Sequence, residues 1–270
     1  MNNNNNNNNK NNDIVLPEDF VIAGKNSGST ESIIDLFDAD NYAKTDEANI
    51  NELYNKMSQS DYEQFLVHIN FNEPYYLRDA IIGRTEDGGL GIISNNNTNN
   101  NKEMIEICDF GCGTGLVGHL LQDAGFTGAN IWGLDASSGF IETINKNGVY
   151  KGGETMFLGQ GVEKFPSMYK NRFDLVTGTG VFLAKHIPSL AFYDAYAALK
   201  VGGIFCFTLR LNLWHDDHDL GYKDVINKLV ADKKMEFLHH VSKEFWRGKE
   251  EGIGLFERQQ SKIFALKKLA

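Results

Sequence analysis

The sequence predicts an α/β fold with a mostly parallel sheet, and three observations support this prediction. Strand-like apolar runs alternate with helical patterns from residue 103 onward, and a glycine-spaced turn at residues 111–115 follows the first run. The last two runs, at 235–241 and 263–266, have no long helix between them. The alternation implies right-handed crossovers between parallel strands, whereas the final pair is expected to form an antiparallel hairpin at one edge.

The expected elements follow one another in order along the chain. The strand-like runs before the closing pair lie at residues 104–109, 131–134, 156–158, 173–177 and 204–209. The helical patterns lie at residues 115–123, from Ser137 or Ser138 through Ile144, at 188–198, and around 225–230. Serine is a common helix N-cap, and Pro188 suits a first helical turn. We therefore expect one α/β domain over residues 103–270.

Two asparagine tracts divide the N-terminal part of the chain. Residues 1–12 are nearly all Asn, and a tract without apolar side chains is expected to be disordered. Residues 95–101 form a second tract, which we interpret as a loop insertion. Between the tracts, residues 31–83 carry apolar side chains at helical spacing. Residues 13–102 are thus predicted to be a helical segment that either packs onto the core or caps a ligand site.

Composition restricts the classes of protein to which this chain can belong. A hydrophobic content of 41% in 270 residues is enough for a core, and no apolar stretch approaches the length of a membrane span. A soluble, cytoplasmic protein is expected. The net charge of -10, with no block of Lys or Arg, disfavours a nucleic-acid partner. Cys108, Cys112 and Cys206 are too few for a disulfide framework, and no second Cys/His pair follows at zinc spacing, so no metal is expected.

The glycine-spaced turn and two acids indicate the kind of ligand. The first strand-like run delivers Asp109, and the three glycines that follow allow positive φ and a close approach of the backbone to a ligand. The next helix would direct its unpaired N–H groups into this turn. Twenty residues beyond Gly115, the second run delivers Asp135, a position suited to hold a ribose diol. A nucleotide-like ligand is therefore expected.

A dinucleotide-binding oxidoreductase is one alternative, because Gly113, Gly115 and Gly118 fit the GxGxxG pattern with Asp135 at a suitable distance. Two features count against it: an acid stands two residues before Gly111, and the terminal hairpin leaves no second substrate domain. No residue suited to handle a proton beside a hydride is evident either.

Several strings in the sequence resemble the successive motifs of class I S-adenosylmethionine-dependent methyltransferases. They are DFGCGTG at 109–115, GLDAS at 133–137, FDLVTGTG at 173–180 and LKVGG at 199–203. The strings CGTGLVGHL, NGVY at 147–150 and KHIP at 185–188 are more narrowly similar to the Williams–Beuren-region methyltransferase-like group. The resemblance covers roughly residues 104–268, and its first motif is the most specific.

The resemblance implies a Rossmann-like seven-stranded sheet in the order 3-2-1-4-5-7-6 and S-adenosylmethionine as cofactor. The implied cofactor-binding residues are Asp109, Gly111, Cys112, Gly113, Gly115, Asp135, Ala136, Gln160, Gly161, Val162, Thr177 and Gly178. Asp135 would hold the ribose, with Ala136 beside the adenine. Many relatives carry an acid after strand three that contacts the adenine. Gly161 occupies that position here, so Gln160 or the backbone of Val162 would serve instead.

The predicted activity is methyl transfer to a small molecule or a protein side chain. A general base is needed only where the acceptor must lose a proton early, and His186 is a candidate by position, although it can equally order the turn before Pro188. The cluster at 214–218 is interpreted as a solvated acidic loop. Tyr54 and Tyr62 are candidates for closing over the cofactor, because aromatic faces attract a sulfonium. A cofactor-binding scaffold without turnover remains an alternative; the acceptor and the oligomeric state are left open.

Overall fold

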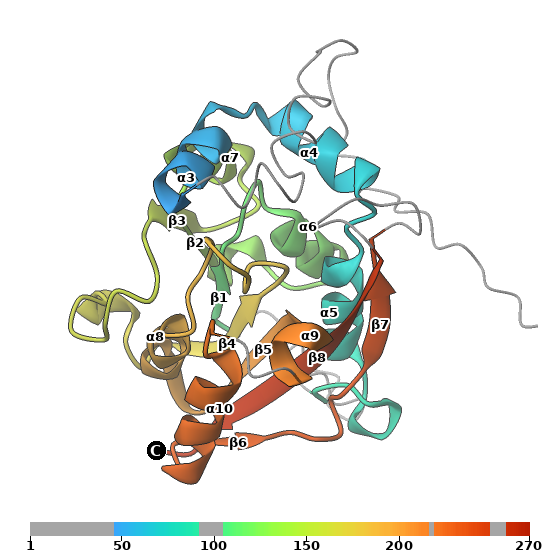
Figure 1. Cartoon of the computed structure of the whole chain (residues 1–270), viewed down its shortest axis with the longest axis vertical. Coiled ribbons are helices and arrows are strands. Elements are labelled where there is room, and N and C mark those ends of the chain that lie inside the picture. The colour runs from blue at the N-terminus through green and yellow to red at the C-terminus, as the bar shows by residue number, and fades with distance from the viewer. Residues whose placement is uncertain (1–45, 92–104, 216–218, 249–257) are drawn as a thin grey trace, which may run out of the picture.

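The computed structural model describes residues 46–91, 105–215, 219–248 and 258–270. In this part of the chain one twisted sheet lies between two layers of helices (Figure 1). No helix among these residues combines the length and apolar character needed to cross a membrane.

The sheet has eight strands, and seven of them form the path β3-β2-β1-β4-β5-β8-β6. The strands are β1 (Ile107–Phe110), β2 (Ile131–Asp135), β3 (Gly152–Thr155), β4 (Phe173–Gly178), β5 (Leu199–Arg210), β6 (Met235–Phe237), β7 (Glu244–Arg247) and β8 (Gln259–Lys268). β1 pairs in parallel with β2 and β4, and β8 pairs antiparallel with β5 and β6. The predicted order and the antiparallel terminal pair are both confirmed.

Two differences from the predicted sheet matter for the site. An eighth strand, β7, pairs with β8 beside β6, and the sequence patterns did not predict it. β3 spans Gly152–Thr155 instead of residues 156–158. A Cβ at Gly153 would lie 2.4 Å from Cδ1 of Ile144, so a larger residue there would need the Ile144 side chain to move. A strand with two glycines has no apolar run by which to recognise it.

Four helices of the α/β part lie within a few residues of the predicted ones, whereas α9 (Leu211–His215) was not predicted. The helices are α3 (Glu47–Lys56), α4 (Gln59–His68), α5 (Glu73–Ile82), α6 (Leu116–Asp123), α7 (Ser138–Asn147), α8 (Ala191–Ala198), α9 (Leu211–His215) and α10 (Tyr222–Ala231), with short 3-10 turns η2 (Thr85–Asp87), η4 (Gly128–Asn130) and η5 (Ser167–Tyr169). Ser137 is the N-cap of α7, where its hydroxyl accepts the Phe140 N–H at 3.3 Å. α8 begins at Ala191, three residues after Pro188.

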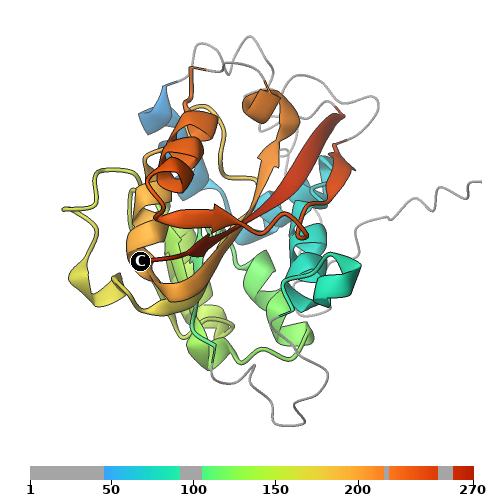
Figure 2. The same ribbon diagram turned by 90° about the horizontal axis from the view of Figure 1, so that it is seen from below.

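Each face of the sheet has its own apolar core. α8 and α10 cover one face, and α5, α6 and α7 cover the other, so that the sheet separates them in Figure 2. The first core is rich in aromatic side chains and includes Phe192, Phe205 and Phe207. A third cluster joins α3 and α4 to α6 through Ile50, Phe65 and Leu120. The N-terminal helices therefore pack directly onto the helix that follows the glycine-spaced turn.

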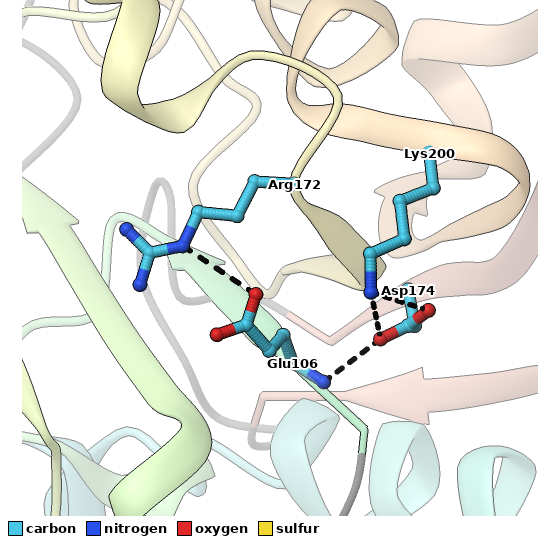
Figure 3. A network of polar contacts seen from close by, with 4 residues as sticks. All are labelled: Glu106, Arg172, Asp174 and Lys200. Carbon is cyan, nitrogen blue, oxygen red and sulfur yellow. Dashed lines mark hydrogen bonds and ion pairs between the residues drawn. The ribbon is translucent and has the colours of Figure 1, made fainter.

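A polar network joins the amino-terminal ends of three adjacent strands (Figure 3). Asp174 accepts the Glu106 N–H at 3.0 Å and pairs with Lys200 at 2.9 Å. Arg172 pairs with Glu106 at 3.5 Å and stacks over the Trp132 ring at 4.4 Å. These contacts lie at the edge of the sheet opposite the carboxyl ends of the parallel strands, so they stabilise strand register and take no part in the site described below.

Candidate functional site

A cleft opens at the carboxyl ends of the central parallel strands, beneath α3 and α4. The glycine-spaced turn, Asp135 and the loop after β4 line one side of it, and Tyr54 and Tyr62 line the other. The centre of a water molecule can move through about 170 Å³ of this cleft, more than ten times the space that one water needs. The cleft is therefore large enough for a small organic ligand.

The glycine-spaced turn lies in the floor of the cleft because its first two glycines permit close contacts. Gly111 and Gly113 both have positive φ, at 66° and 55°. A Cβ at Gly111 would lie 2.5 Å from Cγ1 of Val181 in the loop after β4, and one at Gly113 would lie 3.4 Å from the Tyr62 ring. The turn is thus held between the loop after β4 and helix α4.

Asp135 lies at the end of β2 with its carboxylate fixed by backbone donors. One oxygen accepts the Gly113 N–H at 2.9 Å and the other accepts the Ser137 N–H at 2.8 Å. Burial raises the pKa of this carboxyl, while the N–H groups of Ser137, Gly113 and Ala136 act in the opposite direction. A carboxylate offers about four lone-pair sites, so the backbone donors leave capacity for a hydroxyl of a ligand.

Asp109 lies beneath the turn and does not line the cleft. Its two oxygens accept hydrogen bonds from the Tyr150 hydroxyl at 2.8 Å and the Thr177 hydroxyl at 2.7 Å. The Tyr150 oxygen in turn accepts the Gly118 N–H at 3.0 Å. Burial raises the pKa of Asp109 to about 6, against the effect of both hydrogen bonds. We infer that Asp109 and Thr177, which were expected beside the cofactor, hold the turn in shape instead.

The residues after β3 line the cleft at different positions from those expected. Met156, Phe157 and Leu158 line it, whereas the expected contacts at residues 160–162 do not. The reason is the earlier end of β3, which turns the chain toward the cleft directly after Thr155. Phe157 remains 49% exposed, so one face of its ring is available to a ligand.

A similar shift applies after β4. Gly178 is buried at the end of the strand, where a Cβ would lie 2.8 Å from the Phe182 ring, and the lining residues are Thr179, Gly180 and Val181. The buried hydroxyls of Thr179 and of Thr114 in the glycine turn both line the cleft, and neither has a hydrogen-bond partner among the described residues. A buried hydroxyl without a hydrogen-bond partner is unfavourable, so these two hydroxyls favour binding of a ligand that supplies the missing partner.

A group of aromatic side chains covers the glycine-spaced turn from the side of the N-terminal helices. The Tyr62 ring lies 4.6 Å from the Phe140 ring, and the Tyr54 ring lies 5.7 Å from the Phe140 ring. The Tyr54 hydroxyl is 2.9 Å from Nε2 of His186, and Nδ1 of His186 is 3.0 Å from the Ala184 carbonyl oxygen. The helices α3 and α4 therefore bring both predicted tyrosines to the cleft.

The tautomer of His186 follows from these two contacts. Because a carbonyl oxygen can only accept, Nδ1 carries the proton and Nε2 accepts from Tyr54. Burial lowers the pKa of His186 to about 4, so the ring is neutral near pH 7. Its basic nitrogen is directed at Tyr54, which indicates a role in orienting that tyrosine.

Two arginines lie at the other end of the cleft, and the sequence patterns did not identify them. Arg210 ends β5 and Arg247 ends β7, and both line the cleft. Nε of Arg247 lies 2.6 Å from Oε1 of Glu73, and the Thr208 hydroxyl donates to the same carboxylate. The available signal was the alternation in β7, where Phe245 and Arg247 are buried. This alternation was missed because Arg247, one of the two buried residues, is charged.

No group of three or more metal-ligating side chains occurs among the residues that the structure describes. The three cysteines are buried and free. The cluster at 214–218 was expected to be a solvated loop, but Trp214 and His215 lie in helix α9, and Trp214 packs against the apolar core. Residues 216–218 lie outside the described part of the chain.

Comparison with known proteins gives a match over the centre of the chain. Residues 107–203 match a family described as a methyltransferase domain. No curated protein matches the sequence.

Solved structures give weaker similarities. A TehB-like SAM-dependent methyltransferase from Corynebacterium glutamicum is 17% identical, with a TM-score of 0.42, over 62% of this chain and 81% of that one. The magnesium protoporphyrin IX methyltransferase of Synechocystis, solved with bound SAM, is 13% identical, with a TM-score of 0.46, over 91% of this chain and 100% of that one.

Because these TM-scores are low, the two solved structures carry no argument. The similarity to methyltransferases rests on the matched residues and on the strand order. The order observed here, with antiparallel β8 between β5 and β6, differs from the 3-2-1-4-5-6 order of dinucleotide-binding folds. The narrower similarity to the Williams–Beuren-region group is not confirmed. The chain is therefore similar, over residues 107–203, to a methyltransferase domain.

Proposed function

We propose that this domain transfers the methyl group of S-adenosylmethionine to a small-molecule acceptor bound in the same cleft. The observation that carries the proposal is the arrangement of Asp135, the glycine-spaced turn and the aromatic group of Tyr54 and Tyr62 around one cavity. These three features suit, in turn, a ribose, an amino-acid moiety and a sulfonium.

The adenosine moiety is assigned to the end of the cleft near β2 and β3. Asp135 would accept hydrogen bonds from the two ribose hydroxyls. The N–H groups of Gly113 and Ser137 hold its carboxylate in one orientation, so its remaining lone pairs have fixed directions. Phe157 would lie against the adenine, because a half-exposed aromatic ring at the rim offers a stacking face. Ala136 and Met156 line the same region.

The amino-acid moiety is assigned to the glycine-spaced turn. Helix α6 starts at Leu116, so its first N–H groups and the positive end of its dipole lie beside the turn. The unpartnered hydroxyl of Thr114 lines the cleft at this point. Together they would bind the carboxylate of the methionine part.

The methyl group would then lie between the turn and the aromatic group. When bound, S-adenosylmethionine supplies a methyl group that passes to a lone pair of the acceptor while the carbon–sulfur electrons stay with sulfur. Tyr54 and Tyr62 would attract the cationic sulfur through their ring faces. The packing of α3 and α4 over the cleft would exclude water and align the acceptor, effects that can supply about 7–11 kcal/mol.

The enclosure of the cleft favours a small molecule over a protein side chain as the acceptor. Ile50, Tyr54 and Tyr62 cover it from above, and Phe71 and Pro74 close it toward α5. A cofactor-binding scaffold without turnover is the second candidate, since the geometry that holds a cofactor does not by itself require an acceptor.

Calorimetric titration with S-adenosylmethionine tests the binding. A carboxylate that accepts two hydroxyls contributes roughly 1.5–3 kcal/mol, so Asp135→Asn should weaken binding about tenfold or more. Asp174→Asn is the matched control, because Asp174 lies at the opposite edge of the sheet and should leave the affinity unchanged. Equal affinity of Asp135→Asn and the wild type would contradict the assignment.

Turnover separates the two candidates. The purified protein, S-adenosylmethionine and fractions of small molecules from a cell extract should yield S-adenosylhomocysteine in at least one fraction. If the protein binds the cofactor but forms no S-adenosylhomocysteine with any small-molecule fraction, the scaffold is favoured.

A further inference from the structure

Asp135 and two arginines lie on strands at different ends of the cleft. Among the described residues, the carboxylates that line it are Glu47 on α3 and Asp135 on β2, while the cations are Lys185, Arg210 and Arg247. β2 and β5 are three strand positions apart in the sheet, which corresponds to roughly 14 Å. Asp135 therefore lies at the end assigned to the adenosine, and Arg210 and Arg247 lie at the far end, which we call the basic end; Lys185 belongs to the loop after β4, between the two.

The register of the sheet places both arginines together at the basic end. Arg210 lies opposite Ser261 on β8, and Arg247 lies opposite Gln259. Residues two apart on a strand share a face, and residues directly opposite one another share it too. Arg210 and Arg247 therefore lie on the same face of the sheet, on the two strands that flank β8.

Arg247 is held in place by a buried network. Glu73 pairs with its Nε at 2.6 Å, and the Thr208 hydroxyl donates to Glu73 and accepts the Gly180 N–H at 2.9 Å. The Asn72 amide donates to the Trp246 carbonyl at 2.9 Å, which fixes β7 against the start of α5. The guanidinium is thus positioned before any ligand arrives.

Both guanidinium groups belong to buried side chains that line the cleft. Arg210 is 9% exposed and Arg247 is 4% exposed. A guanidinium presents its five donors in a planar fork, a geometry that suits a carboxylate or phosphate in the cleft that both side chains line. The buried Thr179 hydroxyl lines the same cleft, is 6% exposed and has no partner among the described residues. Phe71 and Pro74 add apolar contacts on the side of α5.

We propose that the methyl acceptor is a small molecule with a carboxylate or phosphate group, which Arg210, Arg247 and Thr179 bind at the basic end of the cleft. This proposal rests on the proposed methyl-transfer function. It adds the chemical class of the acceptor and names three specificity-determining residues.

The test measures anion binding to the protein saturated with S-adenosylhomocysteine. Benzoate and inorganic phosphate serve as probes, with benzamide as the neutral counterpart of benzoate and sodium chloride as the ionic-strength control. At millimolar concentration, benzoate or phosphate should raise the melting temperature of the wild type, whereas benzamide and sodium chloride should not. The probe that binds identifies the group as a carboxylate or a phosphate.

Variants locate the site. Arg210→Gln should weaken binding of the probe at least tenfold while S-adenosylhomocysteine binds as before. Because Arg247→Gln alone would leave Glu73 buried without its cation, the double variant Glu73→Gln/Arg247→Gln is used, and it should weaken the probe similarly. Arg172→Gln, at the opposite edge of the sheet, is the control and should bind the probe as the wild type does.

Two outcomes overturn this proposal. The first is a wild type that binds S-adenosylhomocysteine but shows no preference for benzoate or phosphate over benzamide and sodium chloride. The second is probe binding that both arginine variants retain in full. A wild type that does not bind S-adenosylhomocysteine would instead overturn the proposed function itself, so the two failures are distinguishable.

Discussion

Replacing Tyr150 with Phe tests how the glycine-spaced turn is supported from below. The buried Tyr150 hydroxyl donates to Asp109 at 2.8 Å and accepts the Gly118 N–H at 3.0 Å. Loss of the hydroxyl removes one of the two hydrogen bonds to the Asp109 carboxylate and leaves the Gly118 N–H without that acceptor. Both groups are buried, so water does not readily replace the lost contacts.

The expected loss of stability depends on pH. The bond to ionised Asp109 contributes about 1.5–3 kcal/mol, and an unsatisfied N–H costs about 1–3 kcal/mol, so Tyr150→Phe should lower the free energy of unfolding by about 2.5–6 kcal/mol at pH 8. The pKa of Asp109 is raised from 3.8 to about 6, so ionisation of this carboxyl opposes folding. Its protonated form contributes stability that is fully present below pH 3.8 and is lost as the pH rises through 6. Near pH 5 the protonated Asp109 makes an uncharged bond, and the loss should fall by about 1–2 kcal/mol.

Urea denaturation of both proteins at the two pH values measures this difference. Tyr169→Phe is the matched control, because the Tyr169 hydroxyl donates to exposed Glu154 at 2.7 Å, and a bond of this kind contributes only about 1 kcal/mol. A loss for Tyr150→Phe no larger than that of the control, or one that does not grow from pH 5 to pH 8, would refute the supporting role of Tyr150 and Asp109.

Three further predictions concern separate parts of the molecule. Because the pKa of His186 is lowered to about 4, the pH profile of kcat/KM should show no inflection near pH 6.5 that His186→Asn removes; such an inflection would make His186 a titrating base. Phe157→Ala should weaken S-adenosylmethionine binding about tenfold in calorimetry, because stacking on a base contributes about 1–3 kcal/mol. Phe157→Tyr should bind as tightly as the wild type. Equal affinities of Phe157→Ala and the wild type would exclude the adenine contact. Asp174→Asn breaks a half-exposed pair with Lys200 and the bond from Glu106, so urea denaturation should show a loss of about 1 kcal/mol, and a loss above about 3 kcal/mol would contradict this account of the edge network.

The central part of the fold could be predicted because its signals are local. Strands β1, β2 and β4 are largely buried on both faces and carry mostly apolar side chains, and the glycine turn follows from residues adjacent in the chain. Asp135 was identified for the same reason, since it directly follows a buried run. Gly118 has a structural explanation that the pattern did not reveal: a Cβ there would lie 2.2 Å from Cε2 of Tyr150.

The remaining parts of the site depend on contacts between distant segments. The pattern at 31–83 predicted helices, and α3, α4 and α5 lie within it, but their docking over the cleft comes from packing of Ile50 and Phe65 on α6. Residues 31–45 lie outside the described part of the chain. Arg247 reaches the cleft only because β7 pairs with β8 and Asn72 fixes it to α5. No pattern within residues 244–247 indicates either contact.

The division of the chain at residue 103 stays a prediction. The N-terminal helices contribute Tyr54 and Tyr62 to the cleft, and α5 contributes Glu73 to the buried ion pair with Arg247. We therefore propose that the helical segment and the α/β domain form the site together.

A crystal structure of the complex with S-adenosylhomocysteine tests most directly whether this cleft is the cofactor site. The account predicts the ribose hydroxyls within hydrogen-bond distance of the Asp135 carboxylate, the adenine against Phe157, and the sulfur below Tyr54 and Tyr62. A ligand bound elsewhere on the molecule, or an Asp135 side chain turned away from a ribose in the cleft, would contradict it.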